Sequence, residues 1–519
     1  MRGFAGVIAE LGTSNASRRS STIPRVAHRS EVKLPAASSL FVPFLQQSRM
    51  NPRLETLSNL RGPADLESAG YDMLALMGEL FPICRSISGN GLRRSLARLC
   101  DLIPLAIREV STGTQVFDWT VPKEWNIRDA YIKDPTGRRV VDFQKNNLHV
   151  VNYSVPVSAR MRLSDLLPWL HSLPEHPDWI PYRTSYYAPT WGFCLSHRQL
   201  QALPDAEYEV VIDSTLEDGA ITYGECVLPG QSEDEFLIST HVCHPSLAND
   251  NLSGVAVAVA LARVLAPVPR RYTYRFLFVP GTIGAIAWLF RNRATVNRVK
   301  HGLVLACVGD RGNLDYKRSR RLNADIDRAV EHVLKTKGAP FAVKDFSPYG
   351  YDERQYCSPG FDLAVGSFRR TPHGEYPEYH TSADNLEFVS ASHLADSLAT
   401  LLEVVDLLEN DLRFVNQSPM GEPQLGRRGL IPALGGKAAK DDQLALLWAL
   451  NLSDGTNGAL DIAERSGLPF DSIRRAIDAL TACGLLEPAR AAGRGTDRPP
   501  AHGEHTPPLA NIIPARLRA

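Results

Sequence analysis

Three side chains of the kind that bind metal ions lie close together in the middle of the chain. His241, His244 and Asp250 follow the short apolar segment 236–238 and precede the apolar run 255–265. The first segment predicts a buried strand, and the second is long enough for a helix. Imidazole and carboxylate groups at the carboxyl end of a strand are typical zinc ligands. The spacing therefore predicts a metal site in the loop between this strand and this helix.

A helix-capping loop is the alternative interpretation of the same segment. In that case Asn249, Asp250 or Ser253 is the N-cap of the helix, and the two histidines are merely polar. The concentration of ligand-type side chains between one strand and one helix favours the metal site.

Two further candidate ligands occur in corresponding settings downstream. Asp310 follows the apolar segment 302–308, which predicts another buried strand. His380 lies in the polar segment 374–385, ahead of a predicted helix over 391–408. Taken singly, an aspartate after a strand is more often a turn or cap residue. Together with His241 and Asp250, these side chains form a ligand set suited to one or two zinc ions.

The elements that must position these ligands alternate between strands and helices. After the histidine segment, strands are predicted over 274–279, 302–308 and 361–365, with helices over 283–290 and 321–335 between them. Such alternation is typical of an α/β domain, with a mostly parallel sheet covered by helices on both faces. We assign residues 69–109 and 234–412 to this three-layer domain.

The segment 110–233 has a different pattern of apolar and polar residues. Short alternating runs and the turn sequence 134–137 predict a β-rich domain inserted ahead of the histidine segment. Its aromatic loop over 182–192 could wall a substrate cleft, and an ordinary packed loop fits equally well.

The C-terminal part reads as a separate unit. Residues 413–440 are rich in Gly and Pro and predict a linker, and 441–488 have the helix pattern of a winged helix. The helix expected to read DNA carries Asp471 and Asp478 beside Arg474 and Arg475. These acidic groups favour a protein-contact or cleft-capping role, and we expect no specific binding to duplex DNA.

Composition limits the remaining possibilities. Lys+Arg and Asp+Glu both number 57, so net charge calls for neither nucleic acid nor membrane as a partner. Eight cysteines without a CxxC pair indicate reduced thiols and a cytoplasmic protein. Residues 1–68 and 489–519 have the composition of disordered tails, and Met50 is a possible alternative start. The sequence leaves homo-oligomer formation open.

Two long motifs carry a family resemblance. They are Ser-Thr-His-x-Cys-His-Pro-Ser-x-Ala-Asn-Asp-Asn-x-Ser-Gly over 239–254 and Gly-Glu-Tyr-Pro-Glu-Tyr-His-Thr-Ser-Ala-Asp-Asn over 374–385. Over about residues 69–490 the chain resembles bacterial aminopeptidase-like proteins related to the co-catalytic zinc aminopeptidases. The resemblance implies a sheet of the zinc-exopeptidase type, an inserted β-rich domain and a C-terminal winged helix.

The resemblance also implies roles for individual residues. Asp250 would bridge two metals, His241 and Asp310 would complete one site, and His380 would belong to the other. Asp352 falls in a segment that supports the site in the peptidases. The peptidases also have a Glu-Glu pair, which provides the general base and a metal ligand, at the position of Gly281-Thr282. His244 could replace the lost ligand.

The general base must then come from another carboxylate. Glu353, Glu375 and Glu378 lie on segments that should border the site, and we favour Glu378 because it is close to His380. The alternative is that these glutamates pair with nearby arginines, of which Arg354, Arg369 and Arg370 are candidates.

Three functions follow, in order of preference. The first is a zinc-dependent amidohydrolase acting on a small peptide or an acylated amine. The second is a catalytically reduced relative that keeps metal for structure or binding, with the winged helix as its working surface. The third is a winged-helix transcription regulator with a sensor domain.

Overall fold

The computed structural model describes residues 63–430 and 437–489. The predicted tails therefore lie mostly outside the described residues, as does Met50. Helix α2 (Pro63–Leu80) begins inside the segment that we predicted to be a tail. A proline at the first helical position is favourable there, because the first N–H groups of a helix have no partner within it.

An eight-stranded sheet forms the centre of the α/β domain, in the order β1-β10-β12-β11-β13-β16-β14-β15. Neighbours β12, β11, β13 and β16 are parallel. Strand β10 pairs antiparallel with β1 and β12, and β14 pairs antiparallel with β16 and parallel with β15. This arrangement confirms the predicted α/β class and mostly parallel sheet. The strands are β1 (Leu105–Ser111), β10 (Ala220–Leu228), β11 (Glu235–His241), β12 (Thr273–Val279), β13 (Val299–Leu305), β14 (Leu314–Lys317), β15 (Phe341–Lys344) and β16 (Val365–Arg369).

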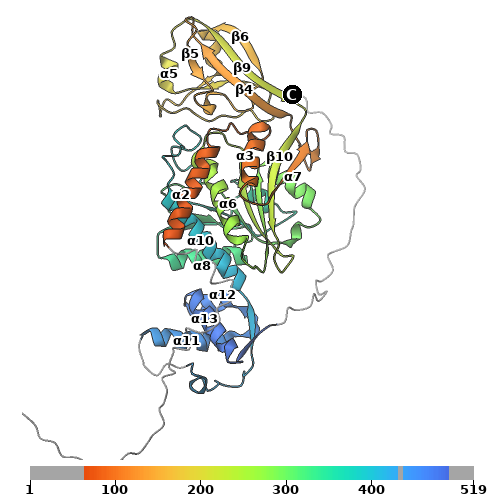
Figure 1. Ribbon diagram of the computed structural model, residues 1–519, viewed down its shortest axis with the longest axis vertical. Coiled ribbons are helices and arrows are strands. Elements are labelled where there is room, and N and C mark those ends of the chain that lie inside the picture. The colour runs from red at the N-terminus through yellow and green to blue at the C-terminus, as the bar shows by residue number, and fades with distance from the viewer. Residues whose placement is uncertain (1–62, 431–436, 490–519) are drawn as a thin grey trace, which may run out of the picture. The chain divides into compact units, whose positions relative to one another are not determined.

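Helices cover both faces of this sheet (Figure 1). In β11, Phe236 and Ile238 belong to one buried apolar cluster and Leu237 to the other, because successive side chains of a strand point to opposite faces. The first cluster includes α2, α3 (Asn90–Cys100), α6 (Gly254–Leu265), α8 (Asp325–Lys337) and α10 (Ala391–Asn410). The second includes α7 (Ile283–Asn292) and α9 (Glu353–Tyr356). The core is therefore the three-layer arrangement expected from the alternation of elements.

The inserted segment is shorter than predicted. We assigned 110–233 to it, yet β10 pairs with β1 and with β12 in the main sheet. The residues of β10 are almost all buried, whereas those of β9 (Glu207–Glu217) alternate between buried and partly exposed. Continuous burial is typical of a strand covered on both faces, and alternation of a strand covered on one. The separate sheet thus ends before β10.

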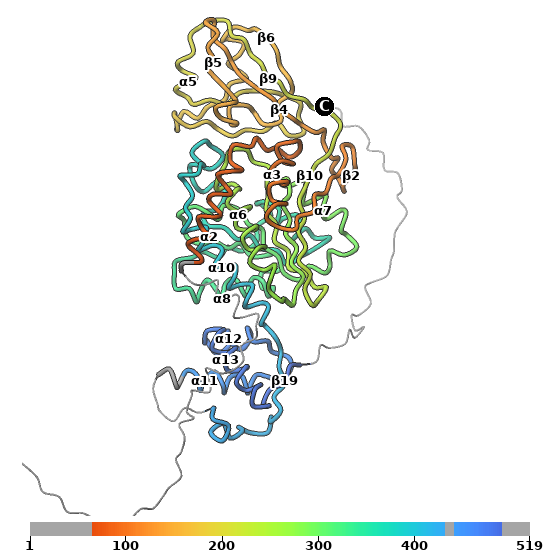
Figure 2. The backbone as a smooth tube through the Cα atoms, in the orientation of Figure 1, coloured from red at the N-terminus to blue at the C-terminus, as the bar shows by residue number. Residues whose placement is uncertain are grey.

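Four antiparallel strands make up the separate sheet, in the order β5-β4-β9-β6. Figure 2 shows these strands side by side. Besides β9 they are β4 (Glu124–Lys133), β5 (Arg139–Asp142) and β6 (Val157–Arg162). Smaller elements near this sheet are α4 (Leu163–Leu166), β7 (Leu170–His171), β8 (Phe193–Cys194) and α5 (His197–Gln201). The hairpin of β2 (Gln115–Val116) and β3 (Trp119–Thr120) packs instead beside α7 (Figure 2).

The loop that follows β7 contacts the segment that carries His380. The backbone N–H of Tyr182 donates to the His380 carbonyl at 2.7 Å, and the N–H of Ser382 donates to the Ile180 carbonyl at 2.8 Å. Ser382 Oγ in turn accepts from the N–H of Ile180 at 2.9 Å. The aromatic loop therefore lies beside a predicted ligand, as the cleft-wall interpretation requires.

The winged-helix unit includes a strand that we predicted to be linker. Strand β17 (Arg413–Asn416) pairs with β18 (Asp454–Gly458) and β19 (Leu486–Pro488) in a three-stranded sheet. The linker prediction for 413–440 is wrong at its start, because pairing with distant strands stabilises a segment whose own pattern is weak. The helices are α11 (Lys437–Leu452), α12 (Ala459–Ser466) and α13 (Phe470–Ala482).

Acidic residues of α12 are bound by the α/β domain. Arg328 of α8 lies 2.6 Å from carboxylate oxygens of both Asp461 and Glu464. These ion pairs join α12 of the winged helix to α8 of the α/β domain. All eight cysteines are unpaired. None of the described helices is long and apolar enough to cross a lipid bilayer.

Candidate metal centre

Strand β11 delivers His241 to the carboxyl edge of the sheet. Every residue of this strand is buried, and the one-turn irregular helix Ala248–Ser253 leads from the following loop into α6. Gly254 is required at the start of α6, because a Cβ there would lie 2.5 Å from the Leu305 carbonyl oxygen. The close approach of α6 to β13 fixes the segment that carries Asp250.

The carboxylate of Asp250 is the centre of the cluster. His241 Nε2 lies 2.8 Å from its Oδ1, and His380 Nε2 lies 3.0 Å from its Oδ2. Tyr351 also donates its hydroxyl to Oδ1 at 2.8 Å. Asp250 and His241 are fully buried, whereas the His380 side chain is 34% exposed. The centre is therefore reached from the His380 side.

His244 joins this group. One ligand atom each from His241, His244 and Asp250 lie within 4.8 Å of one another. The His244 ring is 4.8 Å from that of His241 and 5.2 Å from that of His380, measured between ring centroids. The structure thus brings together four of the five residues predicted to bind metal.

The spacing of these groups fits a zinc ion. Two ligand atoms at zinc-bond distance and a tetrahedral angle lie roughly 3.3 Å apart, close to the two separations around Asp250. Asp250 Oδ2 and His380 Nε2 face each other without hydrogen-bond geometry, and within the described residues neither has another partner. Buried polar atoms left in this way are suited to coordinate a cation.

The electrostatics favour the ligand protonation states. Burial alone would raise the pKa of Asp250, but His244, His241 and His380 hold it well below its usual range. Burial lowers the pKa of His244 well below that of free imidazole. An ionised carboxylate and a neutral imidazole are the forms that bind metal.

Asp384 positions the backbone that carries Asp250. Its Oδ1 accepts the N–H of Asn249 at 2.6 Å, and its Oδ2 accepts the N–H of Asp250 at 3.0 Å. Burial raises the pKa of Asp384 to about 8, and Asp250 adds to this effect. The sequence analysis gave Asp384 no role, although it lies in the same motif as His380.

Asp310 is not brought into the cluster. Its Oδ1 accepts from the Gly312 N–H at 2.7 Å and from the Thr371 hydroxyl at 2.6 Å. Its Oδ2 accepts from Asn249 Nδ2 at 2.9 Å and from the Thr371 N–H at 3.2 Å. With both oxygens engaged by neutral donors, Asp310 joins three loops, and the role of metal ligand that we predicted for it does not match this placement.

The carboxylate of Asp352 differs from that of Asp310 in its hydrogen bonding. It is fully buried, and neither of its oxygens has a hydrogen-bond partner among residues 63–430 and 437–489. Burial raises the pKa of Asp352 to about 7. A Cβ at Gly281 would lie 3.2 Å from the Cβ of His241 and 3.8 Å from Asp352 Oδ1. Asp352 therefore borders the space that a side chain at position 281 would enter.

The glutamates predicted as bases are placed differently. Glu353 forms a buried ion pair with Lys317 at 2.5 Å, and Glu375 accepts from Lys344 at 3.0 Å. The partners are thus lysines, not the arginines that we considered. Glu378 is half-buried, and the described contacts of this residue are made by its carbonyl, which accepts from Thr381.

Tyrosines at the centre were missed by the sequence analysis. Tyr351 stacks on His241 with ring centroids 4.5 Å apart, and its hydroxyl lies 3.0 Å from that of Tyr379. Tyr379 stacks on His380 at 3.9 Å. Both tyrosines directly precede residues that we had singled out, and this adjacency was the available signal.

Arg85 supports the centre from the loop between α2 and α3. Its Nε donates to the His244 carbonyl at 2.9 Å, and its Nη1 donates to the Leu80 carbonyl at the end of α2. The side chain is buried, and burial lowers its pKa to about 10. The sequence analysis did not connect Arg85 with His244.

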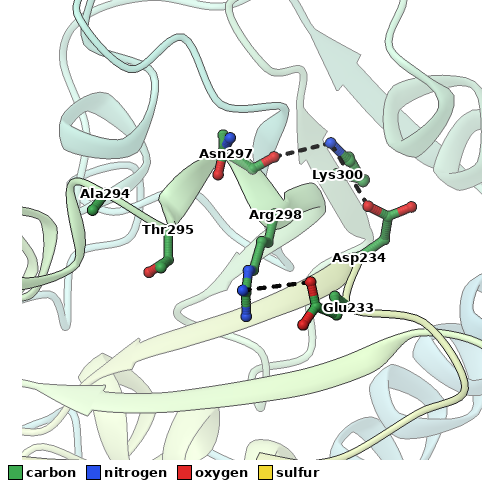
Figure 3. A pocket seen from close by; sticks show the side chains of 7 residues that line it. All are labelled: Glu233, Asp234, Ala294, Thr295, Asn297, Arg298 and Lys300. Atoms are coloured by element: carbon green, nitrogen blue, oxygen red, sulfur yellow. Dashed lines mark hydrogen bonds and ion pairs between the residues drawn. The ribbon is translucent and has the colours of Figure 1, made fainter. Parts of the chain in front are cut away.

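A surface pocket lies at the other edge of the sheet. Figure 3 shows it lined by side chains that include Glu233, Asp234, Arg298 and Lys300. These residues precede β11 and flank the start of β13, whereas the candidate centre lies where β11 ends. This pocket is therefore separate from the metal centre.

An α/β domain of aminopeptidase-like class, joined to a winged helix, is defined by this fold and centre. The family described as domain of unknown function DUF4910 matches residues 74–411, and a winged helix-turn-helix family matches residues 413–488. The chain belongs to the DUF4910 family.

Several known proteins are similar to this chain. A Clostridium acetobutylicum protein is 51% identical over 419 residues, which are 80% of this chain and 96% of that protein. It is named as a candidate polysaccharide biosynthesis protein with an aminopeptidase-like domain. The crystal structure of a candidate peptidase from the same organism has a TM-score of 0.80 and 48% identity, covering 83% of this chain and 100% of the other. The structure of a zinc aminopeptidase from Bacillus subtilis has a TM-score of 0.49 and 14% identity. The match covers 65% of this chain and 94% of the aminopeptidase chain.

Proposed function

We propose that the protein is a zinc-dependent amidohydrolase that acts on an acylated amine or a small peptide. The observation that carries the proposal is the placement of Asp250 between His241 and His380, with His244 beside them. A helix-capping loop does not need three imidazoles around one buried carboxylate.

His241, His244, Asp250 and His380 would hold the metal. A zinc ion bound there would supply an activated water and would polarise the carbonyl of the substrate. The same ligands would serve one or two zinc ions. His380 is the exposed member, so the substrate approaches from its side of the centre.

Asp352 is the general base of the proposed mechanism. It borders the space at Gly281, and its free carboxylate, whose pKa is raised to about 7 by burial, is suited to accept a proton near neutral pH. Glu353 is committed to Lys317. This assignment replaces our preference for Glu378.

Tyr379 is the proposed donor to the reacting carbonyl oxygen, because the single hydroxyl hydrogen of Tyr351 is donated to Asp250. The Tyr379 hydroxyl lies 3.0 Å from that of Tyr351. Phenol O–H groups held in a buried site stabilise negative charge as it develops on oxygen.

The proposed substrate class rests on the chemistry of amide hydrolysis and on the name of the Clostridium acetobutylicum relative. A polysaccharide biosynthesis protein with an aminopeptidase-like domain is 51% identical to this chain. An acylated amino sugar is an acylated amine that such a protein would meet, and we propose this class as the substrate.

Metal content and turnover test the proposal. Elemental analysis of the purified chain should find zinc, and a panel of N-acyl amino sugars and aminoacyl anilides should include a substrate. Asp352→Asn should lower turnover about 10²- to 10⁴-fold and keep the zinc. The exposed Glu387 supplies the control, because Glu387→Gln removes a carboxylate outside the centre.

Several outcomes would contradict the proposal. Purified protein that contained no zinc would remove the basis of the hydrolase proposal. Zinc-loaded protein that is inactive on the whole panel would favour the catalytically reduced relative. If Glu378→Gln abolished turnover and Asp352→Asn did not, the base would be Glu378.

A further inference from the structure

Three exposed aromatic side chains lie on two neighbouring segments, the β2–β3 hairpin and the loop that carries Tyr187. Phe117 and Trp119 are each 44% exposed, and Tyr187 is 47% exposed. The Trp119 and Tyr187 rings lie 5.2 Å apart, and Phe117 packs edge-on against Phe290 at 5.3 Å. We call Phe117, Trp119 and Tyr187 the aromatic platform. Rings that are packed on one side and open on the other offer a face to a flat ligand.

The backbone holds two of these rings in unusual conformations. Phe117 has a φ of 54° and Tyr187 a φ of 66°, in the left-handed region that bulky residues rarely adopt. Val116 and Trp119 pair directly, so Phe117 lies in the tight turn between β2 and β3. Asn, Asp or Gly is the usual residue at such a position. A strained turn that presents an exposed phenylalanine is explained better by binding than by folding.

The platform adjoins the metal centre through a series of tyrosines. Tyr187 directly follows Tyr186, whose hydroxyl lies 3.0 Å from that of Tyr182. The Tyr182 ring lies 5.2 Å from His244 and 5.1 Å from His380. The segment 182–187 therefore joins the platform to the metal centre.

The size of the platform selects a small ligand. Three aromatic residues of this exposure present roughly 300 Å² in total. A stable protein–protein interface needs about 800 Å² from each partner. One or two sugar rings cover the smaller area, and the C–H faces of a pyranose stack on indole and phenol rings.

We propose that the aromatic platform binds the saccharide part of the substrate and holds it beside the metal centre. This inference rests on the proposed function for its link to catalysis, but saccharide binding itself can be measured without turnover. The Trp119 and Tyr187 rings are tilted by 58°, so the sugar ring would stack on one and contact the other at its edge. The acylated amine would extend toward Tyr182 and His380.

Saccharide binding by the full chain tests the inference. An array of bacterial glycans identifies the best ligand, and calorimetry then measures its affinity for zinc-loaded and chelator-treated protein. Trp119→Ala and Tyr187→Ala should each weaken binding about tenfold, because stacking on an aromatic ring contributes that much. Trp119→Phe should retain part of the affinity. Tyr71→Ala is the matched control, since Tyr71 is 60% exposed on α2, outside the platform.

The possible outcomes separate the two proposals. Unchanged unfolding midpoints and zinc content would show that the platform variants are folded. No binding to any glycan, or equal affinity in wild type and both alanine variants, would overturn the inference, as would displacement of the glycan by an aromatic dipeptide. Platform-dependent binding in a protein without zinc or turnover would support the platform and contradict only the hydrolase proposal.

Discussion

The loop after β11 and the loop after β13 carry the same kind of residue and use it differently. Asp250 and Asp310 both follow central parallel strands, and both are buried. Two imidazoles and a phenol surround Asp250, whereas backbone amides, a side-chain amide and a threonine hydroxyl surround Asp310. The first carboxylate can share its oxygens with a cation, and the second is used to join loops.

The comparison shows that position at a strand end does not define a ligand. What matters is which groups already bind the carboxylate oxygens. Four neutral donors satisfy Asp310, and exchanging them for a metal would leave buried N–H and O–H groups without partners. Asp352 and Glu353 repeat this contrast in adjacent residues, since only Glu353 has Lys317 as a partner.

Removing the central carboxylate should have the largest effect. Asp250→Ala deletes the group shared by both histidines, so we expect zinc affinity to fall at least about 100-fold, beyond the effect of losing a supporting partner of a ligand. Competition with a chelator dye would measure this. If the variant kept the zinc affinity of the wild type, Asp250 would not be the metal-binding carboxylate of this comparison.

The same type of change at Asp310 should affect stability and leave metal in place. Asp310→Asn turns an amide N–H₂ toward groups that are themselves donors, and we expect the free energy of unfolding to fall by about 1–3 kcal/mol. Urea unfolding of chelator-treated protein gives this value, and the chelator dye gives the zinc affinity. If zinc affinity fell as steeply as in Asp250→Ala, Asp310 would be a ligand after all.

Removing one hydroxyl donor from each carboxylate sharpens the comparison with a smaller effect. Thr371→Val should cost about 0.5–1.5 kcal/mol of stability, because Asp310 loses a buried hydrogen bond. Tyr351→Phe removes the corresponding bond to Asp250 and should change zinc affinity less than about threefold. Equal losses of zinc in the two variants would indicate that the loops do not differ as described.

Much of the fold was predictable because it depends on local periodicity. The alternation of apolar strands and helices after residue 236 indicated the α/β class, and the histidine loop was placed correctly between β11 and α6. The boundaries were less predictable. The sheet membership of strands β10 and β17 depends on partners far away in the chain.

The sequence by itself determined the ligand types and their place between a strand and a helix. Only the tertiary structure decided which carboxylates are free, because the hydrogen bonds from Thr371 to Asp310 and the ion pair of Lys317 with Glu353 join residues distant in sequence. The same holds for Asp352, which borders the space at Gly281 through folding alone. The local sequence pattern indicates which helix or strand each segment can form. Whether a buried polar group has a hydrogen-bond partner depends on the residues that tertiary packing brings beside it.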